Sequence, residues 1–376
     1  MSYLKDYLGE MQDLQHFLLE YIDSEAEDEE NYRNLINKYE SSNISKKRGT
    51  IKDFLYLISN IANNHRNPYL IQRIEQLLIH LKNQIGENFT FIDLLLIFKK
   101  NKRIILFLLK EKLIIPNKSI SQLMINMNYH QYFYPEFKEF YPEELRKKIE
   151  AEINEIDNFE EKRLIGENDN YICQLIRQDS VEEFVTFVNK KNYPISSIIP
   201  PSIFETNPFL LKNPPTLIQY TAFYGSIQIF KYLNFNQVNI KDTWLYLIHS
   251  QNAELIHYLE ENCDNPHPNF FRESIKCFSS DITEYIKNIF DDKLPLSSFH
   301  TLYPSLKYHN YKYWPDILDA KYAPFLLIKY DYIDLVKQFI KSDKLEFKRE
   351  MSPDLISQIS IQKLFFLFML FQIIFI

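Results

Sequence analysis

Apolar side chains recur every three or four residues along most of this 376-residue chain. That spacing places them on one face of an α-helix. Runs that alternate apolar and polar residues between turn signals, as strands do, are hard to find. The pattern predicts an all-α protein, with a first helix over residues 3–21. The acidic run SEAEDEE at 24–30 follows this helix and is typical of a solvated face or linker.

Further helices are expected before residue 142. Thr50, with Asp53 three positions later, is suited to cap the helix IKDFLYLISNIANN. In FTFIDLLLIFKKNKRIILFLLKEKLI, the polar residues 99–103 separate two apolar segments, each too short to span a membrane. This second pattern predicts a helical hairpin.

Proline-containing segments divide the chain. An aromatic connector at 129–142 precedes a helix with charges at i,i+4 spacing, such as Glu143 with Lys147. A proline-rich loop at 194–215 interrupts the second half, because proline lacks an N–H donor and disfavours helix in the preceding residue. We therefore expect four regions: an amino-terminal helical region at 1–141, a charged connecting helix at 142–170, helical repeats at 171–343 and a carboxyl-terminal segment at 344–376.

The segment LIQYTAFYGSIQIFKYL, residues 217–233, is either one amphipathic helix or two short helices joined at Gly225. A glycine inside a helix costs only about 1 kcal/mol, so the segment alone does not decide. Other segments share its plan of an apolar stretch, a polar break and a second apolar stretch. Their breaks are at Asp179, Gln251, Ser280–Asp281 and Asp331. The recurrence predicts helix-turn-helix units that stack, because one thin hairpin cannot bury both of its apolar stripes.

The residues TLIQYTAFYGSIQIFKYL resemble a degenerate ankyrin repeat, with Thr216 and Gly225 at the places where such a repeat has them. A longer run, from GENDNYICQLIRQDSVEEFVTFVNK through SIFETNPFLLKN to WLYLIHSQNAELIHYLEEN, resembles a domain of unknown function. That family is expanded in certain parasitic protists, and its members often carry further ankyrin repeats. The likeness covers residues 136–290.

This resemblance implies an ankyrin-like solenoid of stacked helix-turn-helix repeats, a protein-interaction role and no assigned activity. Gln219 stands where ankyrin repeats usually place histidine. The bulky pair Leu247–Ile248 stands where they prefer small residues. We therefore expect the stack to be wider or more tilted than a regular ankyrin array.

The small number of glycines excludes several classes of nucleotide-binding and catalytic site. The chain has five glycines, and no two lie near each other. Loops that cradle phosphate need several glycines close together, because only glycine lets the backbone approach a phosphate closely. Dinucleotide-binding turns, nucleotide-triphosphate loops and the Gly-x-Ser-x-Gly nucleophile elbow are therefore excluded. We expect no enzyme activity, no cofactor and no small-molecule substrate.

Charge and cysteine content favour a cytoplasmic protein that does not bind nucleic acid. The formal net charge of −7 gives no overall basic field for nucleic acid, and the local basic cluster at residues 46–48 is typical of a solvated loop. Three cysteines, Cys173, Cys263 and Cys277, are too few and too scattered for a disulfide framework, which favours a reducing compartment. The amino terminus has no continuous apolar segment of the secretory kind.

One stretch raises the question of a metal site. It contains, in order, His249, His257, Cys263, His267 and Cys277. Structural zinc sites usually take ligands from compact pairs of cysteine or histidine, and here only Cys263 with His267 comes close. We therefore expect buried thiols and ordinary polar histidines, and no bound metal.

Two tyrosines are candidates for partner binding. Tyr220 and Tyr224 would flank the turn of an ankyrin-like unit, where exposed aromatic side chains serve as interface anchors. The alternative is that they pack between repeats, as most of the many aromatic residues must.

The last segment, LFFLFMLFQIIFI at 364–376, is the most apolar run of the chain. At a rise of about 1.5 Å per residue it is shorter than the hydrocarbon core of a bilayer. A final core helix, the end of a truncated product and a membrane tail rescued by Lys363 are the alternatives.

Overall fold

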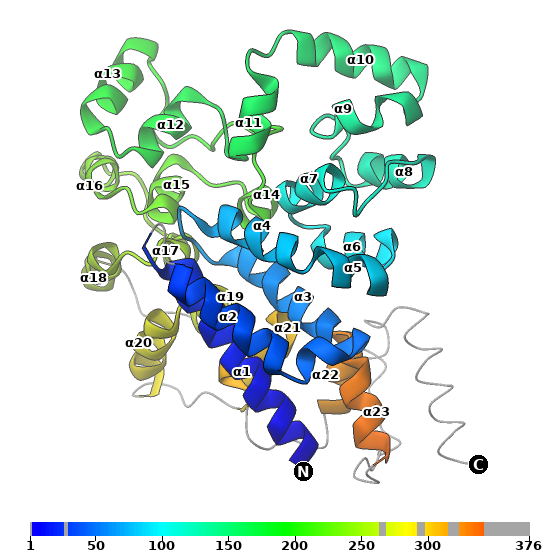
Figure 1. Cartoon of the computed structure of the whole chain (residues 1–376). Helices are drawn as coiled ribbons and strands as arrows, with labels where there is room; N and C mark the ends of the chain where they lie inside the picture. Colours follow the sequence, from blue (N-terminus) through cyan, green and yellow to red (C-terminus); the bar gives the residue numbers. More distant parts are fainter. Residues whose placement is uncertain (1, 26–28, 263–267, 292–297, 315–322, 342–376) are drawn as a thin grey trace. The chain divides into compact units, whose positions relative to one another are not determined.

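The computed structural model describes residues 2–25, 29–262, 268–291, 298–314 and 323–341 (Figure 1). These residues form helices and contain no strand, apart from an isolated bridge between Ile198 and Thr216. The prediction of an all-α protein is confirmed over this part of the chain. The expected carboxyl-terminal segment at 344–376, with its apolar run at 364–376, lies outside the described residues.

The chain divides into two compact units, and the boundary near residue 58 falls inside a helix. The first unit comprises residues 1–58 and 291–376, and the second comprises residues 59–290. The region boundaries that the sequence suggests at 142 and 171 both lie within the second unit and stay predictions.

Helices of the first unit come from both ends of the described chain. They are α1 (Ser2–Asp23), α2 (Glu29–Ser41), η1 (Ile44–Lys46), α3 (Arg48–Asn64, which continues into the second unit), α21 (Ser298–Tyr308), η3 (Tyr311–Tyr313), α22 (Ala323–Lys329) and α23 (Ile333–Lys341).

Helices of the second unit are short and follow one another closely. The first part contains α4 (Leu70–His80), α5 (Lys82–Asn88), α6 (Phe91–Phe98), α7 (Lys102–Lys110), α8 (Lys118–Asn126), α9 (Tyr134–Phe137), η2 (Lys138–Phe140), α10 (Glu143–Asn154) and α11 (Phe159–Ile165). The second part contains α12 (Tyr171–Arg177), α13 (Val181–Lys191), α14 (Pro208–Lys212), α15 (Leu217–Tyr224), α16 (Ile227–Phe235), α17 (Trp244–Ser250), α18 (Ala253–Asn262), α19 (Pro268–Lys276) and α20 (Ser280–Asp291).

Local sequence signals explain several of these helices. Residues 99–101 of the predicted polar break separate α6 from α7, so the predicted hairpin is confirmed. The Asn101 side chain caps α7 by accepting from the Ile104 N–H at 3.0 Å. The predicted capping role of Thr50 is wrong. α3 already begins at Arg48, and the Thr50 hydroxyl instead donates to the Ile44 carbonyl at 2.8 Å.

Two short helices, rather than one long helix, occupy the segment around Gly225. α15 ends at Tyr224 and α16 begins at Ile227. Gly225 has φ +74°, in the left-handed region that glycine adopts without steric penalty. The Ser226 N–H returns to the Thr221 carbonyl at 2.9 Å, which closes the turn at the end of α15. The helix-turn-helix prediction for this segment is confirmed.

Left-handed residues mark the same turn in other helix pairs. Asp179 follows α12 with φ +49°, Gln251 follows α17 with φ +55°, and Asp331 follows α22 with φ +74°. In the pair α19–α20 the left-handed residue is Phe278, so this turn lies shortly before the predicted break at Ser280–Asp281. The pair α22–α23 belongs to the first unit, whereas the other pairs belong to the second.

Side chains at these turns bond to the neighbouring helix pair. The Asp179 carboxylate accepts from two N–H groups in the first turn of α16 at 2.9 and 3.0 Å, where no partner exists within the helix itself. The Ser226 hydroxyl donates to the Ile176 carbonyl at 2.5 Å, and the Asn252 amide donates to the Gly225 carbonyl at 3.3 Å. The turn residues therefore connect pairs as well as ending helices.

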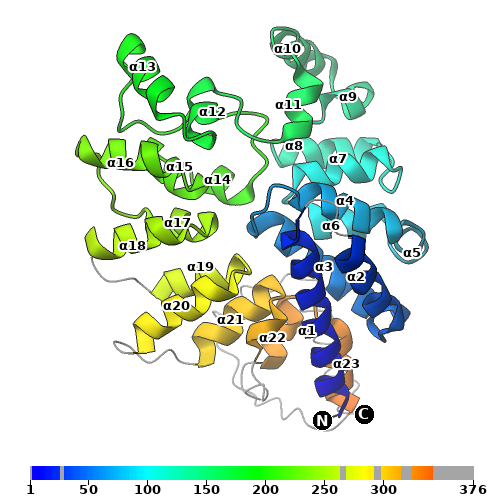
Figure 2. The ribbon, with the colours of Figure 1, turned by 60° about the vertical axis from the view of Figure 1, so that its left-hand side comes forward.

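The helices of consecutive pairs lie in two rows. Figures 1 and 2 show α13, α16, α18 and α20 following one another, with α12, α15, α17 and α19 beside them. Lys231 on α16 pairs with Glu254 on α18 at 2.7 Å. The ring of His257 on α18 lies 5.9 Å from that of Tyr285 on α20. Consecutive pairs in this series therefore contact one another.

A buried carboxyl group lies at the centre of the first unit. Asp53 is 2% exposed and accepts a hydrogen bond from the Tyr7 hydroxyl at 2.9 Å. The Tyr7 hydroxyl also lies 3.3 Å from the hydroxyl of Tyr311, whose ring packs edge-on against Tyr332. Burial raises the pKa of Asp53 well above its usual value, and the hydrogen bond from Tyr7 offsets this only in part. Asp53 therefore keeps its proton to a higher pH in the folded state.

α1 binds the turn before η3 through a buried glutamine. The Gln15 amide donates to Asn310 Oδ1 at 2.8 Å and accepts from the Tyr311 N–H at 2.7 Å. Both polar atoms of a 3% exposed side chain are thereby satisfied, as burial requires.

Membrane crossing needs a helix of about 20 mostly apolar residues. Among the helices that the structure describes, none combines sufficient length with sufficient apolar character.

Replacement of Gly225 by alanine is expected to lower the stability of the second unit by about 1–2 kcal/mol, because the left-handed turn is unfavourable for a residue with a Cβ atom. The matched control is Gly86→Ala in α5, where an added Cβ meets nothing closer than 3.9 Å. That variant should be stabilised by about 0.5–1 kcal/mol. Denaturant unfolding followed by Trp244 fluorescence, in a Trp314→Phe background, measures both. Equal effects of the two changes would contradict the assigned turn.

Asp53→Asn is expected to flatten the pH dependence of the first unit. Unfolded Asp53 releases its proton near the usual value of 3.8, whereas folded Asp53 retains it, so wild-type stability should fall as the pH rises above that value. Trp314 fluorescence in a Trp244→Phe background reports unfolding of this unit. Asp6→Asn, at an exposed position on α1, should keep the wild-type slope. A wild-type stability that rises with pH in this range and is unchanged by Asp53→Asn would refute the assignment.

Candidate functional site

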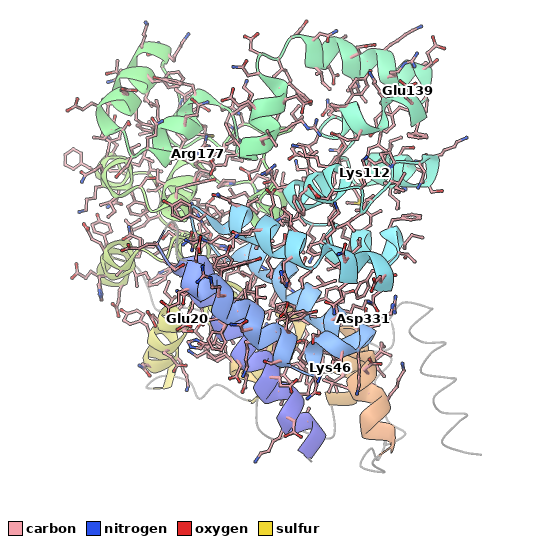
Figure 3. All side chains as sticks on the ribbon, in the orientation of Figure 1. Glu20, Lys46, Lys112, Glu139, Arg177 and Asp331 are labelled. Carbon is pink, nitrogen blue, oxygen red and sulfur yellow. The ribbon has the colours of Figure 1, made fainter. Side chains whose placement is uncertain are left out.

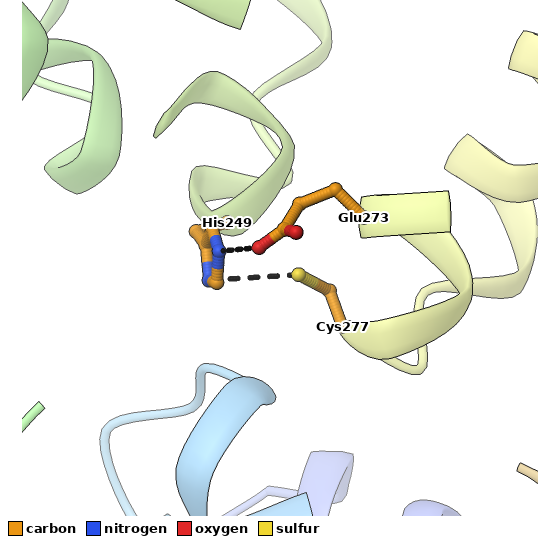
Figure 4. A group of neighbouring side chains, drawn as sticks. All are labelled: His249, Glu273 and Cys277. Carbon is orange, nitrogen blue, oxygen red and sulfur yellow. Dashed lines mark hydrogen bonds and ion pairs between the residues drawn. The ribbon is translucent and has the colours of Figure 1, made fainter. Parts of the chain in front are cut away.

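Three side chains of different chemistry converge in the second unit. His249 lies in the last turn of α17, Glu273 lies on α19, and Cys277 directly follows α19. Glu273 and Cys277 are four residues apart, which places them on one side of the helix end. One ligand-type atom from each of the three residues lies within 4.8 Å of the other two. Figure 4 shows the imidazole facing both the carboxylate and the thiol.

A chain of hydrogen bonds links these groups. His249 Nε2 lies 2.8 Å from Glu273 Oε1, and Cys277 Sγ lies 3.5 Å from His249 Nδ1. Lys276 Nζ donates to the same Glu273 oxygen at 2.5 Å. An ionised carboxylate can only accept, so Nε2 carries the imidazole proton and Nδ1 accepts from the thiol. With these proton positions, each of the three side chains has a hydrogen-bond partner.

The charges within the cluster follow from burial and pairing. Burial lowers the pKa of His249 to about 4, against the opposing effect of Glu273, so the imidazole is neutral at neutral pH. Burial alone would raise the pKa of Glu273, but the hydrogen bond from His249 and the charge of Lys276 outweigh it and lower the pKa to about 2. Burial raises the pKa of Cys277 well above its usual value. The cluster therefore holds a thiol, a neutral imidazole and a Glu–Lys ion pair.

Aromatic rings enclose the imidazole. The Phe209 ring lies 4.2 Å from the His249 ring and the Phe223 ring lies 5.1 Å from it, measured between centroids. Lys276 Nζ lies 4.8 Å from the centroid of Phe209. His249 and Cys277 are both 0% exposed. Their surroundings are therefore apolar and closed to solvent.

The segment that joins α3 to α4 covers this cluster. His65 Nδ1 lies 3.1 Å from the Cys277 carbonyl oxygen and 3.4 Å from the Gln251 amide. The guanidinium of the next residue, Arg66, lies 4.7 Å from the Phe223 ring and hydrogen-bonds to the Phe223 carbonyl. This segment therefore contacts the carboxyl-terminal ends of α15 and of α19 and the turn after α17.

Thiol, imidazole and carboxylate stand in the order of a nucleophile, a base and the group that orients the base. Such a relay needs access to substrate and a thiol that ionises readily. Cys277 has neither, because it is fully buried and its pKa is raised. The same three groups supply sulfur, nitrogen and oxygen donors, which are the ligands that Zn²⁺ takes in proteins. Metal binding therefore suits the cluster better than nucleophilic catalysis.

The structure brings together two of the five residues that suggested a metal site. His249 and Cys277 meet, whereas His257 is exposed and lies 3.6 Å from Glu260 on its own helix. Cys263 and His267, the pair with the most suitable spacing, lie outside the described residues. Glu273 is not among the residues that the sequence pattern singled out, although its spacing of four residues from Cys277 was a usable signal.

The two tyrosines expected to bind partners lie in the packing between helices. Tyr220 is 1% exposed, and its hydroxyl accepts from Arg177 Nη1 at 3.0 Å. Figure 3 labels Arg177, the last residue of α12. The Tyr224 ring lies 4.6 Å from that of Tyr220 and 4.2 Å from the guanidinium carbon of Arg66. The geometry of Tyr220 matches the packing alternative, and a partner-binding role of these tyrosines stays a prediction.

Comparison of the chain with protein-family models, curated proteins and solved structures finds no match. The likeness to ankyrin repeats therefore stays an expectation based on the residues themselves.

Acid is expected to destabilise the second unit through His249. The unfolded imidazole takes up a proton near pH 6.5 and the buried one only near pH 4, so stability should fall by up to about 3 kcal/mol as the pH drops through this window. His249→Phe should remove this part of the slope, although Glu273 then keeps only the hydrogen bond from Lys276. Trp244 fluorescence in a Trp314→Phe background reports unfolding. The control is His257→Gln at an exposed site, and an equal loss of slope in that variant would contradict the prediction.

Proposed function

We propose that this protein is a non-enzymatic scaffold or adaptor that binds other proteins through an ankyrin-like array in its second unit. The observation that carries the proposal is the series of four helix pairs from α12 to α20, in which each pair packs on the next. In repeat proteins, neighbour-to-neighbour packing of this kind creates an extended surface that serves for recognition of other macromolecules.

The turn chemistry supports an array rather than an irregular bundle. Asp179, Gly225 and Gln251 each end a first helix with a positive φ. Side chains at or beside these turns bond backbone groups of the adjacent pair. A repeated device at equivalent positions is expected of a repeat architecture, since each unit must bury one side on its neighbour.

Exposed apolar side chains supply candidate contacts for a partner. Phe235, the last residue of α16, is 86% exposed, and Ile198 in the proline-rich loop is 60% exposed. The His249–Glu273–Cys277 cluster, in contrast, is closed to substrate. A formal net charge of −7 favours a protein partner over nucleic acid. The alternative of a tail-anchored protein rests on residues 364–376, outside the described part, and stays a prediction.

Site-specific photocrosslinking in cells of the native organism tests the scaffold role. A photoreactive residue placed at Phe235 or Ile198 is expected to form discrete adducts with the same one or few proteins. The same probe at Lys191, an exposed polar position at the end of α13, is the control and should give none. The captured protein, once purified, should bind Phe235→Ser about tenfold or more weakly than wild type.

Two outcomes would overturn the scaffold role. One is the absence of specific adducts at Phe235 and Ile198 while the variants fold normally. The other is catalytic turnover by the purified protein, on hydrolase, kinase or transferase substrates, that is abolished by a single change of an acidic residue or a histidine. Phe235→Ser should itself leave stability within about 0.5 kcal/mol, because the side chain is exposed.

A further inference from the structure

The spacing of sulfur and nitrogen in the buried cluster matches one edge of a zinc coordination tetrahedron. Zinc bonds to thiolate sulfur at about 2.3 Å and to imidazole nitrogen at about 2.0–2.1 Å, which puts two tetrahedral ligands about 3.5 Å apart. Cys277 Sγ and His249 Nδ1 lie 3.5 Å apart. These two donors therefore need little movement to share one ion.

We propose that His249, Glu273 and Cys277 bind a single Zn²⁺ ion. The donor set contains the sulfur, nitrogen and oxygen ligands that zinc prefers. Binding releases the Cys277 proton to solvent, so that a thiolate and a carboxylate supply two negative charges to the divalent ion and the Lys276 ammonium beside the carboxylate adds one positive charge. Lys276 lies 2.5 Å from Glu273 Oε1, so it can stay paired with this carboxylate. The proposal does not depend on the scaffold role.

Glu273 must move the most on binding. Its carboxylate now contacts Nε2 of the imidazole, on the side away from the Sγ–Nδ1 edge. The three ligand atoms lie within 4.8 Å of one another, whereas tetrahedral zinc ligands lie about 3.5 Å apart, so the carboxylate must leave Nε2 and move by about 1–2 Å toward the Sγ–Nδ1 edge. Three protein ligands leave the fourth position of the ion for a non-protein ligand.

An ion bound at this cluster would crosslink two helix pairs. His249 belongs to α17, whereas Glu273 and Cys277 belong to the end of α19, so the ion would join two successive helix pairs. The unfolded chain does not hold these residues together. Zinc should therefore bind the folded state preferentially and raise its stability.

Cobalt substitution tests the site in the full-length protein. One equivalent of Co²⁺, added to protein freed of metal by chelator and dialysis, should produce thiolate-to-cobalt charge-transfer absorption and the visible bands of a tetrahedral ion. Zn²⁺ should displace it with a stoichiometry of one and raise the unfolding temperature. Cys277→Ser should abolish the charge-transfer absorption, and Glu273→Gln should weaken binding by about tenfold or more.

Cys173→Ser is the matched control, because Cys173 is also buried but belongs to no such cluster among the described residues. It should bind cobalt as the wild type does. The proposal fails if natively folded wild type gives no charge-transfer absorption with Co²⁺. It also fails if Cys277→Ser binds with unchanged affinity and spectrum, since the thiolate ligand would then be another cysteine.

Discussion

The short helices of the second unit are stable only when they pack against neighbouring helices. The helices of the four pairs from α12 to α20 contain 7 to 12 residues each. Isolated helices of that length are marginal in water. Their stability has to come from burial of their apolar sides and from satisfaction of the N–H and carbonyl groups at their ends. The hydrogen bonds that Asp179 accepts and that Ser226 and Asn252 donate meet the second need, because they satisfy backbone groups at the helix ends.

The buried polar cluster is a product of the same packing. α17 and α19 are first helices of successive pairs, so their carboxyl-terminal ends lie side by side. His249 and Cys277 lie at these ends, and Glu273 comes one turn earlier on the second helix. Aromatic side chains from α14 and α15 then close the space around the imidazole. Placing an ion pair, a neutral imidazole and a thiol there is possible because each group has a partner.

Local patterns predicted the helices well and the polar cluster poorly. Periodicity, the glycine at 225 and the polar break at 99–103 identify helices and turns, since those signals act over a few residues. The Thr50 cap failed because a Ser/Thr and an acid three residues on also occur inside helices, and here Asp53 is needed as an acceptor for Tyr7. Glu273 was missed, and Tyr220 was considered as a surface anchor, because burial depends on which helices become neighbours. Which helices become neighbours depends on contacts between segments that are distant in sequence, and patterns within a few residues do not report those contacts.

The contact of His65 with Cys277 joins residues separated by 212 positions. A stack in which every hairpin touches only its neighbours can nucleate anywhere and grow one hairpin at a time. A bond that spans so much chain requires a large loop to close first, and such non-local contacts slow folding. This contact links the last helix pair of the second unit to the chain just after α3, so removal of that pair would also disturb this segment.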